Sequence, residues 1–188
     1  MSQGLGLAGC SLGLQIDYPW LEVARAKLAR QYLTESTCAR VFLRDDDVFP
    51  EVETVARMIK VLDFGAPCVV APYCQRFDRD KWDVSFEPDG RFHSAGLGCA
   101  LFERRVFEAL WASYRRPLGF LQDGEELVHL YRDMLVDRDD GTQLYKEDEA
   151  FWFRVQECGF SPAVLEDVTV PHAGEARRYI SKAGAPNP

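Results

Sequence analysis

A strand–helix–strand pattern in the first half of the chain most limits the folds that this sequence can adopt. Continuous apolar runs at residues 40–44 and 67–73 indicate two short buried strands, and the helix predicted between them, over residues 50–63, has apolar side chains along one face. Strands that are apolar throughout are typical of a parallel sheet covered on both faces. The pattern therefore predicts an α/β fold with a mixed, mostly parallel sheet flanked by helices.

The other expected elements come from the same periodic signals. Residues 82–86 and 91–94 flank the turn sequence Glu87-Pro88-Asp89-Gly90, which predicts a small β-hairpin. Because 188 residues suffice for one sizeable core, a single domain is expected over 1–188, with an abbreviated N-terminal segment (1–19) and a C-terminal tail (175–188). Helices are predicted over 20–33, 103–114 and 147–158, a short helix around 125–135, and a last strand over 163–170.

The first predicted strand ends on three consecutive carboxylates, Asp45, Asp46 and Asp47. Neighbouring negative charges repel one another, so a cation is expected beside them. Alternate side chains of an extended chain point the same way, which lets Asp45 and Asp47 face one site while Asp46 points elsewhere. The alternative interpretation is an acidic loop or helix cap after an edge strand.

Further candidate groups lie where other elements begin or end. Glu147 and Asp148 begin a predicted helix, and His172 follows a predicted strand. Taken alone, the carboxylates fit ordinary N-terminal helix charges and the histidine fits a structural role. Together they suggest one site, since ligands of open α/β sheets bind at the carboxyl ends of strands. An ion held by Asp45, Asp47 and His172 would leave positions open for diphosphate oxygens, and Glu147 or Asp148 could act as a general base.

Phosphate contacts are suggested by charge and by glycine. Arg25, Arg44 and Arg76 could pair with phosphate, although solvated surface arginines are the simpler interpretation of each. The segment Gly96-Leu97-Gly98 could allow close approach of a ligand, or it could mark a packed turn.

The order of these motifs resembles that of GT-A-fold nucleotide-sugar glycosyltransferases, closest to glycosyltransferase family 2. Residues 42–50 resemble the DxD strand and the proline that opens the next helix. Residues 146–151 resemble the helix start of that family that carries a Glu-Asp pair, and 172–174 its C-terminal HxG. The other matching segments are 24–29, 69–76 and 96–107, so the resemblance covers residues from about 20 to 180.

The resemblance implies an inverting, metal-dependent transfer of a sugar from a nucleoside diphosphate donor to an unknown hydroxyl acceptor (a saccharide, lipid or protein). It implies Mn²⁺ or Mg²⁺ as the divalent cation and a GT-A-like, Rossmann-related fold. The implied metal ligands are Asp45, Asp47 and His172; the implied base is Asp148 or Glu147; the implied donor-binding residues are Arg25, Asp46, Arg76 and Gly98.

Two departures from the family keep other functions open. Ala26 stands where an asparagine usually follows the arginine, and only 24 residues precede Arg25. Either residues 4–16 form an abbreviated first strand, or the nucleobase pocket is incomplete unless a homodimer completes it. The alternatives are therefore a truncated or degenerate domain that binds a nucleotide or partner without catalysis, and a metal-dependent phosphohydrolase that acts on nucleotide sugars.

Composition limits the partners and the compartment. The net charge of −8 argues against nucleic acid as a partner, because phosphate binding needs a basic face. No apolar stretch approaches the ~20 residues of a membrane span, so no membrane span is expected. The six cysteines are scattered without metal-binding spacing, which favours reduced thiols and a cytoplasmic location.

Overall fold

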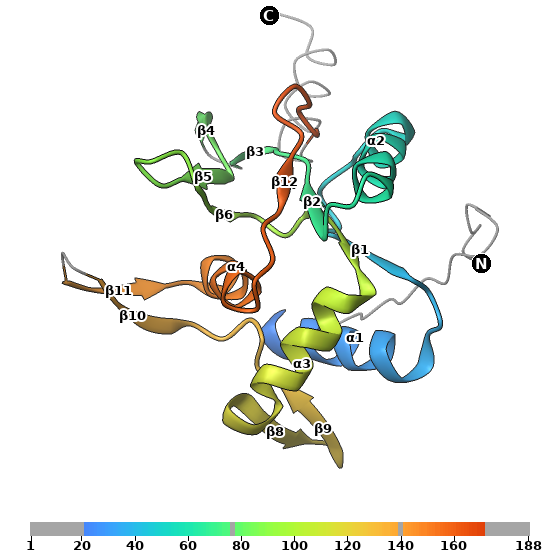
Figure 1. Cartoon of the computed structure of the whole chain (residues 1–188), viewed down its shortest axis with the longest axis vertical. Helices are drawn as coiled ribbons and strands as arrows, with labels where there is room; N and C mark the ends of the chain where they lie inside the picture. Colours follow the sequence, from blue (N-terminus) through green and yellow to red (C-terminus); the bar gives the residue numbers. More distant parts are fainter. Residues whose placement is uncertain (1–20, 76–77, 139–140, 172–188) are drawn as a thin grey trace, which may run out of the picture.

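A four-stranded sheet with strand order β1-β7-β2-β12 lies at the centre of the chain (Figure 1). The computed structural model describes residues 21–75, 78–138 and 141–171. The strands of this sheet are β1 (Arg40–Arg44), β7 (Cys99–Glu103), β2 (Cys68–Val70) and β12 (Ala163–Val164). The described helices are α1 (Leu21–Glu35), α2 (Val52–Asp63), α3 (Arg104–Leu118) and α4 (Glu147–Glu157).

The prediction of a mostly parallel, GT-A-like sheet is wrong. Strand β7 lies between β1 and β2 and pairs antiparallel with both, whereas β12 pairs with β2 in parallel. Helix α2 therefore joins two strands that are not neighbours in the sheet. An apolar run shows that a segment is buried but gives neither its neighbours nor its direction, so the insertion of β7 left no signal in the strand–helix–strand pattern.

The sheet is covered on both faces. On one face, Val69 and Leu101 pack with Met58 of α2 in one apolar cluster. On the other face, Val70 and Phe102 belong to a larger cluster that includes residues of α1, α3 and α4. Figure 1 shows the same division, with α2 on the opposite side of β2 from α3 and α4. Because neighbouring residues of each strand face different clusters, both faces of the strands are apolar.

Two-stranded hairpins make up the rest of the described chain. The hairpin predicted over residues 82–94 is present as β5 (Val84–Phe86) and β6 (Phe92–Ala95). The others are β3 (Cys74–Gln75) with β4 (Asp78–Trp82), β8 (Gly119–Gln122) with β9 (Glu125–Val128), and β10 (Met134–Arg138) with β11 (Gly141–Tyr145).

The short helix predicted around residues 125–135 is wrong, because β9 and part of β10 occupy that stretch. Strands β8 and β9 are joined by Asp123 and Gly124 alone, with φ angles of 54° and 81°. Positive φ at both loop residues is the geometry for which Asp-Gly is favoured in two-residue hairpins. The Asp123-Gly124 dipeptide is therefore a sequence signal for the β8–β9 hairpin.

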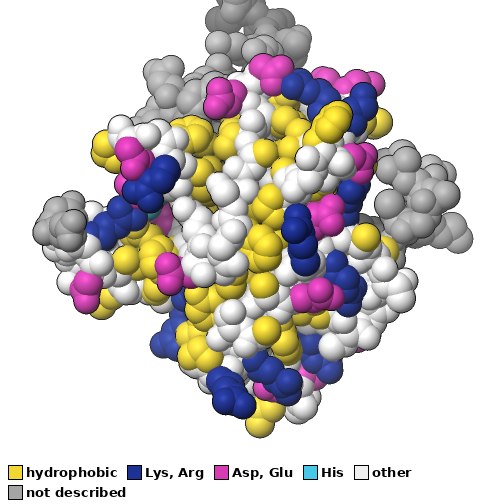
Figure 2. Space-filling view, viewed as in Figure 1, with side chains coloured by type: hydrophobic (Ala, Val, Ile, Leu, Met, Phe, Trp, Pro, Cys, Tyr) yellow, Lys and Arg dark blue, Asp and Glu magenta, His cyan; other side chains and the backbone are white. Residues whose placement is uncertain are grey.

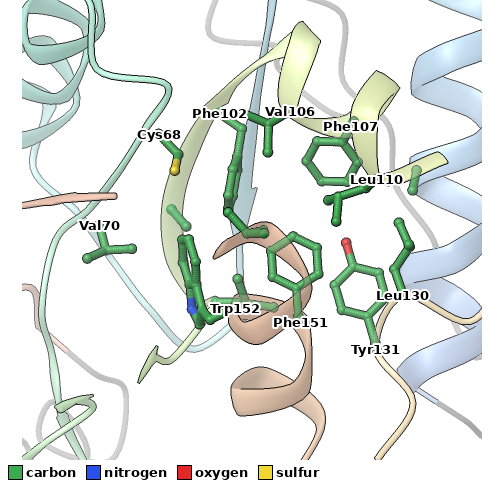
Figure 3. Packing of buried hydrophobic residues seen from close by; sticks show 14 of the residues in the cluster. Cys68, Val70, Phe102, Val106, Phe107, Leu110, Leu130, Tyr131, Phe151 and Trp152 are labelled. Carbon is green, nitrogen blue, oxygen red and sulfur yellow. The ribbon is translucent and has the colours of Figure 1, made fainter. Parts of the chain in front are cut away.

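Helix α4 is held in place by its aromatic side chains (Figure 3). Phe151 and Trp152 are fully buried, and the indole Nε1 of Trp152 donates a hydrogen bond to the Ala95 carbonyl at 2.7 Å. The ring of Phe151 stacks on Tyr131 with a centroid distance of 4.8 Å. These contacts fix the first turn of α4, which carries Glu147 and Asp148.

Two expectations from composition have structural counterparts. In the three described stretches, no helix is both long and apolar enough to cross a membrane. Cys68, Cys99 and Cys158 are free thiols, and burial raises the pKa of Cys68 and of Cys99 to about 12. At neutral pH those two buried groups are therefore uncharged thiols.

Candidate functional site

One buried arginine is paired with three partly buried carboxylates. The guanidinium of Arg25 donates to Asp45 Oδ1 at 3.1 Å, to Asp148 Oδ1 at 2.9 Å, and to Glu147. The Arg25 side chain is only 9% exposed. We call Arg25, Asp45, Glu147 and Asp148 the carboxylate cluster. It brings together helix α1, the end of β1 and the start of α4.

Helix α1 places Arg25 there because its buried face is wider than the predicted one. Apolar spacing predicted a face with Leu21, Ala24, Leu28 and Tyr32, but Leu21 is 51% exposed. Ala24 and Tyr32 are buried as predicted, and Arg25 and Ala29 are buried with them. A buried arginine needs paired charge. Arg25 therefore meets the protein's own carboxylates instead of lying free on the surface for phosphate.

Burial dominates the ionisation of the two carboxylates on α4. Burial raises the pKa of Glu147 to about 7, although the positive charge of Arg25 acts in the opposite direction. Burial also raises the pKa of Asp148, against the charge and hydrogen bond of Arg25 and a hydrogen bond from the Leu97 backbone N–H. Carboxyl groups with a pKa near neutrality can accept and return protons at physiological pH.

The Glu147→Gln variant is expected to remove part of the pH dependence of stability. The folded pKa of Glu147, about 7, lies above its ordinary value of 4.5. This carboxyl therefore contributes stability below about pH 4.5 that is lost as the pH rises to about 7, on the order of 2–3 kcal/mol. The free energy of unfolding, measured by urea denaturation from about pH 5 to 8, should fall less steeply in the variant than in the wild type.

Glu126→Gln is the matched control, because Glu126 is paired with Arg115 on the surface and hydrogen bonding from Arg115 lowers its pKa. The Glu126→Gln substitution should change the pH dependence of the free energy of unfolding only weakly, and in the direction opposite to that of Glu147→Gln. Equal slopes for the wild type and Glu147→Gln would show that Glu147 is not a buried carboxyl with a raised pKa.

A second group of polar residues adjoins the carboxylate cluster at Gly98. The backbone N–H of Gly98 donates to the Tyr73 hydroxyl at 3.2 Å, and Tyr73 N donates to Asp83 Oδ1 at 2.7 Å. A Cβ atom on Gly98 would lie 2.8 Å from the Tyr73 hydroxyl and 2.9 Å from Asp45 Oδ2. The absence of a side chain at Gly98 therefore makes room for two side chains of the protein itself, as the packed-turn interpretation expects.

Asp83 was not identified from the sequence as a candidate. Burial raises its pKa to about 7, although N–H groups of Tyr73 and Gly96 donate to it. Asp83 and Tyr73 are ten residues apart and meet through the fold. The sequence offered no motif that would have found this pair.

The three consecutive aspartates do not continue strand β1. Strand β1 ends at Arg44, and Asp46 and Asp47 lie in a turn in which Val48 N donates to the Asp45 carbonyl at 3.3 Å. The alternation of an extended chain therefore does not apply here. Asp46 is exposed, whereas Asp45 and Asp47 are partly buried.

The described residues do not form a metal site from protein groups alone. A metal ion at this place would need ligands from a bound molecule. Within residues 21–75, 78–138 and 141–171, no three His, Cys, Asp or Glu side chains are grouped to hold a metal ion. Asp45 and Asp47 share one turn, and the side chain of Asp45 is 36% exposed. One or two carboxylates with phosphate oxygens and water are a common environment for Mg²⁺. Two carboxylates, of which Asp45 Oδ1 already accepts from Arg25, are too few to hold a metal ion without further ligands.

The structure thus unites some of the predicted site residues and leaves others outside. Asp45, Glu147, Asp148 and Arg25 meet in the carboxylate cluster, and Gly98 adjoins it through Asp45. The predicted metal ligand His172 and the predicted phosphate contact Arg76 lie outside the described residues.

Comparisons with known proteins give a structural likeness and no family. No known protein family and no curated protein matches this chain. The crystal structure of A197 from STIV is similar, with a TM-score of 0.53 and 17% sequence identity, over 82% of this chain and 68% of A197. At that identity the likeness concerns the fold alone, and it accords with a small mixed-sheet architecture in place of a mostly parallel sheet.

Proposed function

We propose that the protein is a metal-dependent glycosyltransferase that moves a sugar from a nucleoside diphosphate donor to a hydroxyl acceptor. The observation that supports this most is the Glu147/Asp148 pair, two partly buried carboxyl groups with raised pKa values that share Arg25 with Asp45. A general base next to a candidate diphosphate site is what glycosyl transfer to a hydroxyl requires.

The residues of the cluster have distinct parts in this proposal. Asp148 accepts the proton of the acceptor hydroxyl as the oxygen attacks the sugar carbon, and the bond to the departing diphosphate breaks. Arg25 and the Leu97 N–H hold the Asp148 side chain in place. Asp45 and Asp47 would hold Mn²⁺ or Mg²⁺, which neutralises charge on the leaving diphosphate when bound.

Nucleotide binding tests the donor half of the proposal. Thermal unfolding is measured with Mn²⁺ and each of UDP, GDP, CDP and dTDP. A nucleotide at about 100 times its Kd should stabilise the wild type by about 2.7 kcal/mol. The Asp47→Ala variant should lose this shift but keep the melting temperature of the free protein.

Asp167→Ala is the control, since Asp167 is an exposed aspartate whose described partner is Arg57. It should keep the full nucleotide shift. An unchanged shift in Asp47→Ala would refute the assignment of the Asp45–Asp47 turn to the donor site.

A binding domain without turnover is the second candidate. The observation in its favour is that Arg25 already engages both Glu147 and Asp148, which leaves fewer acceptor sites for a substrate proton. Metal-dependent nucleotide binding without sugar transfer to any acceptor would support this second candidate.

A further inference from the structure

A cavity of about 920 Å³ lies between two hairpins and the later turns of α4. Its walls are the β5–β6 hairpin, the β10–β11 hairpin, the later turns of α4 and residues 159–161. We call it the hairpin cavity. Its volume is near the upper end of the range for ligand pockets, which exceeds the needs of a single sugar ring.

Aromatic rings form part of its wall. The cavity is lined by Phe92, Tyr145, Phe153 and Phe160. The ring of Tyr145 packs edge to face against Phe153 at 5.6 Å and against His93 at 5.3 Å. Phe92 and Tyr145 are only 8% and 3% exposed, whereas Phe153 and Phe160 are partly exposed and offer flat apolar surface to a ligand.

Charged groups in the cavity are joined in a network of both signs. Glu87 Oε1 accepts from Arg138 Nη1 at 2.8 Å and lies 3.0 Å from His93 Nδ1. Arg138 also donates to the Tyr145 hydroxyl. Figure 2 shows acidic and basic side chains next to one another over these two hairpins.

The charge of the lining selects among ligand classes. Three acidic residues (Glu87, Asp137 and Glu157) face two basic ones (Arg91 and Arg138). A nucleotide or other polyanion would find no excess of positive charge, and a lipid chain would meet five charged groups. Sugar hydroxyls both donate and accept, and sugar rings have C–H faces that stack on aromatic rings, so a neutral saccharide matches both features of the wall.

The elements that wall the cavity also carry the proposed base. Strand β6 contributes Phe92 and His93 to the cavity and leads into Leu97, whose N–H donates to Asp148. Helix α4 begins with Glu147 and Asp148 and contributes Phe153 one and a half turns later. The cavity wall and the proposed base are therefore positioned by the same two elements, β6 and α4.

We propose that the hairpin cavity binds a neutral oligosaccharide, which is the acceptor of the transfer reaction. That the oligosaccharide is the acceptor rests on the proposed function, but its binding can be measured without any donor.

The test is titration calorimetry of the full chain with hexasaccharides of glucose, mannose, galactose and N-acetylglucosamine, without nucleotide or metal. At least one should bind, and Phe153→Ala and Arg138→Ala should each weaken its binding tenfold or more. Matched controls are Arg115→Ala, which also breaks a surface pair with Glu126, and Phe64→Ala, which removes a 92% exposed ring from the end of α2. Both should bind as the wild type does.

The outcomes separate this inference from the proposed function. Lack of binding by all four hexasaccharides, or equal binding by the cavity variants and the controls, would overturn the cavity assignment, even where nucleotide binding is intact. Oligosaccharide binding that depends on Phe153 and Arg138, in a protein that binds no nucleotide, would uphold the cavity and refute the glycosyltransferase. Folding of each variant is checked by its melting temperature, and a variant that does not fold is replaced by the milder Phe153→Leu or Arg138→Lys.

Discussion

Replacement of Arg25 by methionine is expected to destabilise the protein by about 3–5 kcal/mol, because it leaves three carboxylates in a partly buried site without their shared positive charge. Arg25 is 8% exposed and donates to Asp45, Glu147 and Asp148. Methionine keeps most of the side-chain volume, so the loss reports charge and hydrogen bonding more than packing. The free energy of unfolding at pH 7, from urea denaturation, measures it.

Two further variants separate the causes. Arg25→Lys keeps the charge but cannot reach three carboxylates with one planar group, so its loss should be intermediate. Arg115→Met removes an arginine from an exposed pair with Glu126 and should cost less than about 1 kcal/mol. The loss in Arg25→Met should also shrink at lower pH, since protonated carboxyl groups need no counter-charge. A loss below about 1 kcal/mol at pH 7 would show that the cluster does not depend on Arg25.

The position of Arg25 shows how far local patterns predict this site. Periodicity located α1 and its ends within about two residues, but it assigned the apolar face by the larger side chains. The buried face has small residues, Ala26 and Ala29, which leave room for the Arg25 side chain against Tyr131, whose ring lies 5.6 Å from the guanidinium carbon. Which residues pack against Arg25 depends on tertiary contacts, and the spacing of apolar residues along one helix does not contain that information.

The fold was predictable to a similar extent. Strand β1 and the hairpin β5–β6 lie where sequence patterns placed them, because each depends on local apolar runs and turn residues. The sheet order was not predictable, since the pairing of β7 with both β1 and β2 joins residues up to about sixty positions apart. The meeting of Tyr73, Asp83 and Gly98 has the same origin: each residue is unremarkable alone, and only the strand order brings them to Asp45.

Sugar transfer by the Asp148→Asn variant is expected to fall by about 10²- to 10⁴-fold, the usual contribution of a general base. Asparagine keeps the shape and its Oδ1 can still accept from Arg25, so metal-dependent nucleotide binding should be unchanged. In the wild type, kcat/KM should rise with pH up to the apparent pKa of the Glu147/Asp148 pair, because the base must be deprotonated to accept the hydroxyl proton. Glu147 alone, with a pKa of about 7, places part of this rise near neutrality.

Glu149→Gln is the matched control for this experiment, since Glu149 is the third carboxylate of the same helical turn and accepts a hydrogen bond from Lys146 N at 3.0 Å. A glutamine can accept that bond too, so Glu149→Gln should transfer sugar at the wild-type rate with the same pH profile. The comparison isolates position within the turn, because all three residues share the helix N-terminus and its electrostatic effect. Undiminished transfer by Asp148→Asn would remove Asp148 as the base, whereas equal losses in Asp148→Asn and Glu149→Gln would attribute both to the charge of the helix start.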